Sequence, residues 1–381
     1  MRRMIRVGAA VAAMIALSAC EEPGKTVRVP APTSSAATTT ESPEQALRTG
    51  KLAEGMRIAE VLALPTDIDP RYVRHASSDV LTSARLMVST GHHAAIAAVA
   101  DANDLLAGFL SQRSNGGKGT AGTDWLTHGV MRFPDAATAA SAATEFAAAA
   151  TSDRGMMQSA DWTPATVADA PEARFVLLEE RGRLEGMAFT PYRDYVIFTE
   201  VRAGGRSEIE ATVVEALKRQ RPLLEAFTPT PESELARLPY DPDGIYVLSV
   251  GDNGGGRGAY RQHAALLFAE DQQAAVTLYP KVGVSAMANK GSTVYRAADA
   301  AGAIELATAT AAAIGTARDM KTAPAPAGVP GVSCLTDGNE HANAWVCLVT
   351  AGRHVAEVWA KTRDDAHAGA REQQRVLAAA K

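Results

Sequence analysis

The sequence predicts an α+β protein in which two tandem copies of one domain follow a signal peptide and a disordered tether. Each copy is expected to be an antiparallel β-meander covered by helices. Three short motifs recur in the same order in the second half of the 381-residue chain, about 170 residues later. In both halves an Ala-rich helical run precedes segments of alternating polarity. So long a period indicates two whole domains, because solenoid units are about 20 to 50 residues long.

The N-terminal residues predict export with a lipid anchor. Residues 1–19 combine three arginines with an apolar run over 7–17, which as a helix rises only about 16 Å, half the thickness of a bilayer core. The run is therefore a signal peptide and not a membrane span. It ends in Leu-Ser-Ala-Cys, which resembles the lipobox of bacterial lipoproteins. This resemblance implies a lipid on Cys20 and anchoring to the outer face of the cell membrane. The alternative is an ordinary secretory signal in which Cys20 has no role.

Composition divides the remaining chain. Residues 20–50 are rich in Pro, Ser, Thr and Ala and are expected to form the disordered tether. We place the first α+β copy at 51–230 and the second at 231–381, with a linker at 228–231. Removing the three signal arginines takes the net charge from −5 to −8, and no basic run remains, so nucleic acid is excluded as a partner.

The repeated motifs carry the duplication hypothesis. Leu-Pro-Thr-Asp-Ile-Asp at 64–69 recurs as Leu-Pro-Tyr-Asp-Pro-Asp at 238–243. His-Ala-Ala-Ile, beginning at His93, recurs as His-Ala-Ala-Leu, beginning at His263. A third motif, which ends in Asp-Ala-Ala at 135–137, recurs at 299–301. The offsets of 174, 170 and 164 residues indicate a duplication that has lost a few loop residues.

Within each copy the elements follow from local pattern. Asp135 and Asp299 are predicted N-caps of the Ala-rich helices. Polarity then alternates with a period of two between turn residues, which predicts an antiparallel meander in each copy. The expected strands are 174–178, 184–190 and 195–201 in the first copy, and 332–336, 344–350 and 355–360 in the second. Helices over 207–227 and 363–380 are expected to cover one face of each sheet.

The cysteines predict one disulfide. With Cys20 assigned to the lipid, Cys334 and Cys347 remain, and an even number in an exported chain indicates a disulfide. They lie on neighbouring predicted strands across one turn, within bonding reach. The alternatives are free thiols or a redox pair, which more often has Cys-x-x-Cys spacing.

Several of these stretches together resemble a known family. The lipobox, the Thr/Pro tether, GMRIAEVLALPTDIDP, GSTVYRAADAAGAIELA and the late cysteine pair are similar to uncharacterised lipoproteins of mycolate-containing actinobacteria. The resemblance covers nearly all of the mature chain and implies no activity, catalytic residue or cofactor. The helix followed by a disulfide-bearing meander is also similar to the extracellular sensor domains of actinobacterial membrane kinases.

Motifs for catalysis are absent from the sequence. It contains no Gly-x-Ser-x-Gly, His-Glu-x-x-His or Walker lysine pattern, and we assign no catalytic residue, metal ligand or cofactor. A glycine-rich run at 251–258 either cradles an anion with its amides or forms a mobile loop. Its central residues form the one candidate ligand loop: Asn253, Gly254, Gly255, Gly256 and Arg257.

Repeated polar residues have structural interpretations as well as functional ones. Asp67 and Asp69, like Asp241 and Asp243, are either a cation site or capped turns, and two carboxylates are few for calcium. The repeated histidines, His93 and His263, lack a third metal ligand or a nucleophile at fixed spacing, which favours structural roles. The tryptophans Trp162, Trp345 and Trp359 are expected in the core.

Three classes of function remain. The first is a non-enzymatic envelope lipoprotein that binds a protein partner or an apolar envelope ligand at the junction of the two copies, near the two Leu-Pro motifs and the glycine-rich loop. The second is a hydrolase or lipid-modifying enzyme with residues dispersed in sequence. The third is a structural or antigenic surface protein. The long tether and the duplication favour binding.

Overall fold

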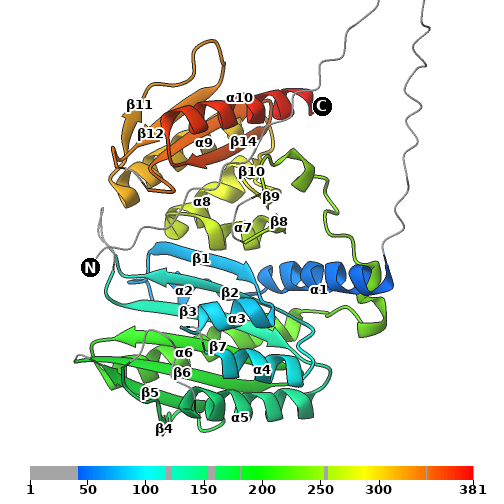
Figure 1. Cartoon of the computed structure of the whole chain (residues 1–381), viewed down its shortest axis with the longest axis vertical. Coiled ribbons are helices and arrows are strands. Elements are labelled where there is room, and N and C mark those ends of the chain that lie inside the picture. Colours follow the sequence, from blue (N-terminus) through cyan, green and yellow to red (C-terminus); the bar gives the residue numbers. More distant parts are fainter. Residues whose placement is uncertain are drawn as a thin grey trace, which may run out of the picture. The chain divides into compact units, whose positions relative to one another are not determined.

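The computed structural model describes residues 42–91, 93–116, 122–152, 159–180, 182–252, 256–339 and 341–380. The predicted signal peptide, Cys20 and the tether as far as residue 41 lie outside these residues. Everything described belongs to one compact unit, Glu41–Lys381. The fold is α+β, with two seven-stranded antiparallel sheets, one in each half of the chain (Figure 1).

The N-terminal half contains six helices and seven strands among its described residues. Its helices are α1 (Pro43–Ala59), α2 (Pro65–Ile68), α3 (Ser83–Ser89), α4 (Ala94–Ala102), α5 (Ala136–Ser152) and α6 (Arg206–Ala226). Its strands are β1 (Arg74–Val80), β2 (Ala107–Ser114), β3 (Trp125–Arg132), β4 (Thr163–Ala165), β5 (Arg174–Glu180), β6 (Arg183–Tyr192) and β7 (Tyr195–Ala203).

The C-terminal half begins with two short 3₁₀ helices, η1 (Glu232–Arg237) and η2 (Tyr246–Leu248). Its helices are α7 (Gln262–Phe268), α8 (Gln272–Val282), α9 (Ala300–Arg318) and α10 (Arg363–Ala379). Its strands are β8 (Gly258–Arg261), β9 (Ala286–Asn289), β10 (Thr293–Arg296), β11 (Lys321–Ala323), β12 (Val332–Thr336), β13 (Trp345–Ala351) and β14 (His354–Ala360).

The two sheets have the same topology. Their strand orders are β1-β2-β3-β7-β6-β5-β4 and, read from the corresponding edge, β8-β9-β10-β14-β13-β12-β11. In each half two helices connect the first two strands, one helix follows the third strand, and one follows the last. The tandem two-domain prediction is confirmed, and each predicted meander is the β5-β6-β7 or β12-β13-β14 part of a larger sheet.

One of the three repeated motifs occupies equivalent places in the two halves. Asp135 and Asp299 open the equivalent helices α5 and α9, with carboxylate oxygens that accept from the amides of Thr138 and Gly302 at 2.8 Å. The Leu-Pro motifs both precede the first strand of their sheet, but 64–69 contains α2, whereas 238–243 lies between η1 and η2. The histidine motif was wrong as evidence of duplication. His93 is the N-cap of α4, the second connecting helix, whereas His263 lies in α7, the first. Short Ala-rich matches of this kind arise from composition.

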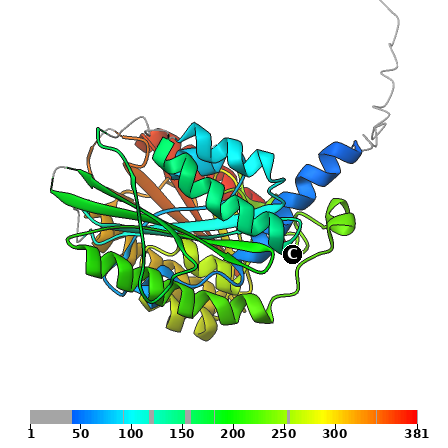
Figure 2. The same ribbon diagram turned by 90° about the horizontal axis from the view of Figure 1, so that it is seen from below.

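Helices cover both faces of each sheet. Figure 2 shows the first sheet nearly edge-on, with α3, α4 and α5 on one side and α6 on the other. In the described part of the chain α9 alone is long and apolar enough to cross a membrane by length and composition, with a hydropathy of 1.3. Only 22% of it is buried, and it packs on the second sheet through Ala303, Leu306 and Ile314.

Helix α1 corrects the predicted length of the tether. Residues 43–50, assigned to the tether, form the first two turns of this helix. Ser42 caps it by accepting from the amide of Gln45 at 3.2 Å, Pro43 takes the first helical position, and Glu44 lies in the first turn. Ser-Pro-Glu-Gln is thus a helix start, although its composition resembles that of a tether.

One apolar core joins the two halves. Phe109 of β2, Tyr260 of β8 and Phe268 of α7 form a triangle of rings with centroids 4.8 to 6.2 Å apart. The buried Arg113 of β2 donates to the carbonyls of Leu267 and Ala269 at the end of α7, at 3.3 and 2.5 Å. Helix α7 therefore lies against the β1-β2 edge of the first sheet (Figure 1).

The disulfide lies where the sequence predicts it. Cys334 of β12 and Cys347 of β13 are directly paired across the antiparallel ladder and are bonded to each other. Both side chains are buried beneath α10, in a core cluster of the second sheet that also contains Ala366 and Leu377. The bond is therefore structural. In the first copy the equivalent face of the sheet, beneath α6, carries the apolar side chains of Phe175 and Leu177 instead.

Replacing both cysteines by alanine is expected to lower the free energy of unfolding by about 3 kcal/mol, because a cross-link restricts the unfolded chain. Urea unfolding of the oxidised protein and of Cys334→Ala/Cys347→Ala measures the difference. Reduced wild-type protein is the control and should unfold with the double variant. Equal midpoints for oxidised protein and variant would contradict a stabilising bond.

Glu357 is a carboxyl group buried in the second sheet. Its Oε2 accepts from the Trp359 indole at 3.0 Å, beside the rings of Tyr279 and Tyr295. Burial raises the pKa of Glu357 to about 7, and the nearby carboxylate of Glu270 contributes to the rise. The protonated form is therefore favoured in the folded state. Its contribution to stability is complete below the unfolded pKa of 4.5 and is lost as the pH rises through 7.

Glu357→Gln keeps an acceptor for Trp359 and removes the titration. Between pH 4 and pH 8 the wild type should lose about 3 kcal/mol of unfolding free energy that the variant keeps. Urea unfolding across this range measures the gain, and the partly exposed Glu305→Gln on α9 is the control. Parallel profiles for wild type and Glu357→Gln would contradict the burial argument.

Candidate functional site

The buried carboxylate of Glu54 holds α1, which lies at the junction between the two halves, against the first half. Its Oε1 accepts from Arg132 Nη1 of β3 at 3.0 Å and from the amide of Thr230 at 2.9 Å. Its Oε2 accepts from the Thr230 hydroxyl at 2.8 Å and from Arg57 at 2.5 Å. A fully buried carboxylate with four donors is bound firmly, because each lone pair would otherwise be unsatisfied.

This network corrects the predicted linker at 228–231. Thr230 is buried and binds Glu54 through both its amide and its hydroxyl. Arg132 also donates to the Thr230 carbonyl at 2.7 Å. The segment is therefore held along α1 and is no exposed connection between independent domains.

Helix α1 also covers the outer edge of β8. The amide of Ala259 donates to the Met56 thioether at 3.0 Å, and the amide of Arg261 donates to Glu60 Oε1 at 2.6 Å. These amides have no neighbouring strand, since β8 is the edge of its sheet. Side chains of the first half thus satisfy a sheet edge of the second, which would otherwise be open to pairing.

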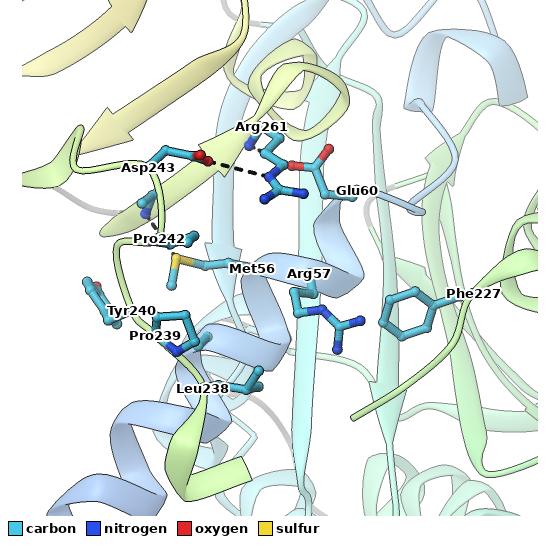
Figure 3. Close-up of a pocket in the computed structure, with 12 residues that line it drawn as sticks. Met56, Arg57, Glu60, Phe227, Leu238, Pro239, Tyr240, Pro242, Asp243 and Arg261 are labelled. Carbon is cyan, nitrogen blue, oxygen red and sulfur yellow. Dashed lines mark hydrogen bonds and ion pairs between the residues drawn. The ribbon is translucent and has the colours of Figure 1, made fainter. Parts of the chain in front are cut away.

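A pocket of about 380 Å³ lies where these segments meet (Figure 3). One wall is α1, another is the connecting segment with Leu238, Pro239 and Tyr240, and β8 closes the third side. Most lining side chains are apolar: Ala53, Met56, Phe227, Leu238, Pro239, Tyr240, Pro242 and Ala259. The volume falls within the ~300 to 1,000 Å³ typical of small-molecule sites.

Charged side chains stand around the apolar pocket. Arg57 lies over the Phe227 ring at 5.2 Å, and Arg261 Nε contacts Asp243 Oδ2 at 3.4 Å (Figure 3). Glu60 accepts from the amides of Arg261 and Ala264 at the start of α7, and burial raises the pKa of its carboxyl. Two cations and two anions thus surround an apolar interior, an arrangement suited to an amphipathic molecule.

The described part of the predicted ligand loop lies outside this pocket. Asn253, Gly254 and Gly255 lie outside the described residues, and neither Gly256 nor Arg257 lines the pocket. Gly256 has φ of 64°, donates its amide to Asp79, and leaves no room for a Cβ, which would lie 2.4 Å from the Ser78 carbonyl oxygen. Arg257 Nη1 pairs with Asp252 at 3.2 Å. The described end of the loop is thus anchored on the first half for structural reasons.

The two Leu-Pro motifs are not brought together. All of residues 238–243 except Asp241 line the pocket, whereas residues 64–69 contain α2, where Thr66 donates to Gln272 at 2.8 Å. Asp241 caps a turn by accepting from the amides of Ile245 and Tyr246 at 2.9 Å. Asp69 accepts from the amide of Arg71 at 3.0 Å. In the described part of the chain no three His, Cys, Asp or Glu side chains are grouped to hold a metal ion.

The histidines are placed by packing and backbone contacts. His93 is buried with its ring 6.3 Å from that of Trp162, and His263 Nε2 lies 2.8 Å from the Leu62 carbonyl oxygen. A serine–histidine pair occurs elsewhere, with Ser78 Oγ 3.2 Å from His75 Nε2. Ser78 is buried beneath α7 and donates to the Leu267 carbonyl at 2.9 Å, so its hydroxyl is no accessible nucleophile.

Glu185 and Glu200 are two buried carboxyl groups in contact with each other. Burial raises the pKa of Glu200 well above its usual range, and the neighbouring Glu185 raises it further. Burial also raises the pKa of Glu185, whose carboxyl is hydrogen-bonded to that of Glu200. Such a pair holds one proton between two groups. Neither side chain lines the junction pocket.

Comparison with known proteins identifies the family. The family described as domain of unknown function DUF7373 matches in two parts, its N-terminal domain over residues 41–240 and its C-terminal domain over 241–380. The chain belongs to the DUF7373 family. The domain boundary thus lies at 240/241, ten residues after the predicted one, and the first domain starts at 41 and includes α1. Among curated proteins no match to this DUF7373 chain was found.

Solved structures also match part of the chain. Among them is the extracellular domain of PknH from Mycobacterium tuberculosis, which is 14% identical with a TM-score of 0.32. The alignment covers 43% of the DUF7373 chain and 96% of the PknH domain.

The residues of α1 that build the site are not marked by any motif in the sequence. Glu54, Met56 and Glu60 face the inside of the molecule, although two of them are acidic. A buried acid removes the polar–apolar contrast by which an amphipathic helix is recognised. The available signal was the helix start at Ser42, which marks this segment of the DUF7373 N-terminal domain as ordered.

Glu54→Gln is expected to lower the free energy of unfolding by about 3 kcal/mol, because it leaves the buried guanidinium of Arg132 with one charged partner fewer. Urea unfolding measures the loss. Glu44→Gln is the matched control on the same helix. Its ion pair with Arg48 is exposed, so its effect should stay within about 0.5 kcal/mol. Equal losses in the two variants would show that Glu54 does not hold α1 against the first half.

Proposed function

We propose that this DUF7373 protein is an exported lipoprotein that binds an amphipathic ligand, a single acyl chain with a polar head group, in the junction pocket. The observation that carries the proposal is the pocket itself, with apolar walls from three segments and charges around them. Its volume of about 380 Å³ suits one chain rather than a whole diacyl lipid. Binding of this kind requires no catalytic group.

The contacts assign parts of the ligand to parts of the site. Met56, Leu238 and Tyr240 offer the apolar surface against which a chain can lie. Met56 is unbranched and polarizable and adapts to ligands of different shape. The head group would lie beside Arg57 and Arg261 or beside Glu60 and Asp243, which form the polar margin. Because α1 and β8 belong to different domains, the ligand would touch both.

A lipid on Cys20 is the second part of the proposal. It rests on the short apolar run and on the Leu-Ser-Ala-Cys sequence. Two acyl chains anchor a protein stably, whereas one chain does so only marginally. An anchored binding protein would take up or present its ligand near the membrane surface. A protein partner on the same surface is the alternative to the acyl ligand.

A hydrolase is the competing function. The pairs that would serve it are Ser78 with His75, and Glu185 with Glu200. Ser78 is only 3% exposed and Glu200 only 4%, and neither lines the junction pocket. A nucleophile or acid needs contact with substrate, and these groups have no such contact at the site described above.

The proposal predicts that decanoate binds to the soluble domain, residues 41–381, and that Leu238→Glu weakens binding at least tenfold. An acyl chain that binds against this wall would have to displace water from the new carboxylate, which costs free energy. Isothermal titration calorimetry measures the affinity. Native mass spectrometry of protein extracted from its own membrane should show a bound mass of one acyl ligand and an acylated Cys20.

Leu47→Glu is the matched control. Leu47 lies on α1, is 37% exposed, and does not line the pocket, so the variant should bind decanoate as the wild type does. Equal weakening by both variants, or no decanoate binding by the wild type, would contradict an acyl site. A stoichiometric protein in place of a lipid in the native spectrum would favour the protein-binding alternative.

A further inference from the structure

A second pocket of about 340 Å³ lies at a different place between the two domains. Arg74 of β1 comes from the N-terminal domain. Arg318 and Asp319 at the end of α9, and the β12–β13 hairpin, come from the C-terminal domain. Among the described residues that line it, Met320 is the single apolar one. The pocket is therefore polar throughout, in contrast to the apolar junction pocket.

Several polar groups of this pocket are held in place by their neighbours. Arg318 Nε donates to Glu270 at 2.8 Å, and its guanidinium lies 4.9 Å from the centre of the Trp359 ring. Asp337 accepts from the amide of Asn339 at 2.9 Å and contacts His341 Nε2 at 2.5 Å. Binding a ligand thus requires little further ordering of these side chains.

The charges of the lining exclude several ligand classes. Arg74 and Arg318 oppose a cation, whereas Asp319 and Asp337 oppose an anion. An apolar ligand would leave the surrounding donors and acceptors without partners. The class that fits is a neutral molecule with many groups that both donate and accept. Sugar hydroxyls have this property, since each is one donor and two acceptors.

We propose that this pocket binds a neutral saccharide. Guanidinium and amide N–H groups donate to its hydroxyl oxygens, and the carboxylates of Asp319 and Asp337 accept from its hydroxyl protons. Asn339 and Asn343 supply both functions in one side chain. The site is independent of the acyl pocket, because the two share no lining residue.

The test uses residues 41–381 with neutral disaccharides and trisaccharides of glucose, mannose, galactose and arabinose, and with glucose 6-phosphate and glucosamine as charged probes. Saturation-transfer NMR should detect at least one neutral saccharide at about 10 mM, an accessible range for weak sites. Asn339→Ala/Asn343→Ala should weaken that saccharide about tenfold, because two side chains that bond hydroxyls are lost.

Leu238→Glu is the orthogonal control and should bind the saccharide normally, while the double asparagine variant should bind decanoate normally. An unchanged thermal midpoint shows that the double variant is folded. The proposal is overturned if no neutral saccharide binds, if the double variant retains full affinity, or if a charged probe binds more tightly than every neutral one.

Discussion

The structure depends on the hydrogen-bonded carboxylate of Glu54. Its four donors come from β3, from α1 itself and from Thr230 in the segment that follows α6, so one buried anion fixes three parts of the first domain. With α1 held there, Met56 and Glu60 reach the free edge of β8. The junction pocket follows from this arrangement, because its walls are the same α1, connecting segment and β8. A duplicated fold thus becomes one unit through a helix that precedes the first repeat.

The parts that the sequence predicted are those with a clear local signal. The meander strands alternate in polarity, and Cys334 pairs with Cys347 across the turn expected for them. Strand β2 was missed because it is buried on both faces, so that Phe109 packs in one core cluster and the adjacent Leu110 in another. At the site, residues 238–243 were expected, but Glu54, Met56 and Glu60 act through contacts across more than 170 residues. Local pattern carries no information about such partners.

The two domains share a topology but meet through surfaces that are not alike. α1 and the β1-β2 edge of the first domain contact β8 and α7 of the second. This junction contains two pockets of opposite character, an apolar one beside α1 and a polar one beside β1. The two ligands that we propose for these pockets, an acyl chain and a saccharide, are the two components of a glycolipid.

The central claim is that α1 covers the edge of β8 and thereby makes the two domains one unit. Native-state hydrogen exchange, followed by NMR at the amides of Ala259 and Arg261, tests it most directly. If α1 covers the edge, both amides exchange only when α1 is released, with the same opening free energy as the amides of Ala53 and Ile58. Exchange of Ala259 and Arg261 at the rate of exposed amides, while those of α1 stay protected, would contradict the claim.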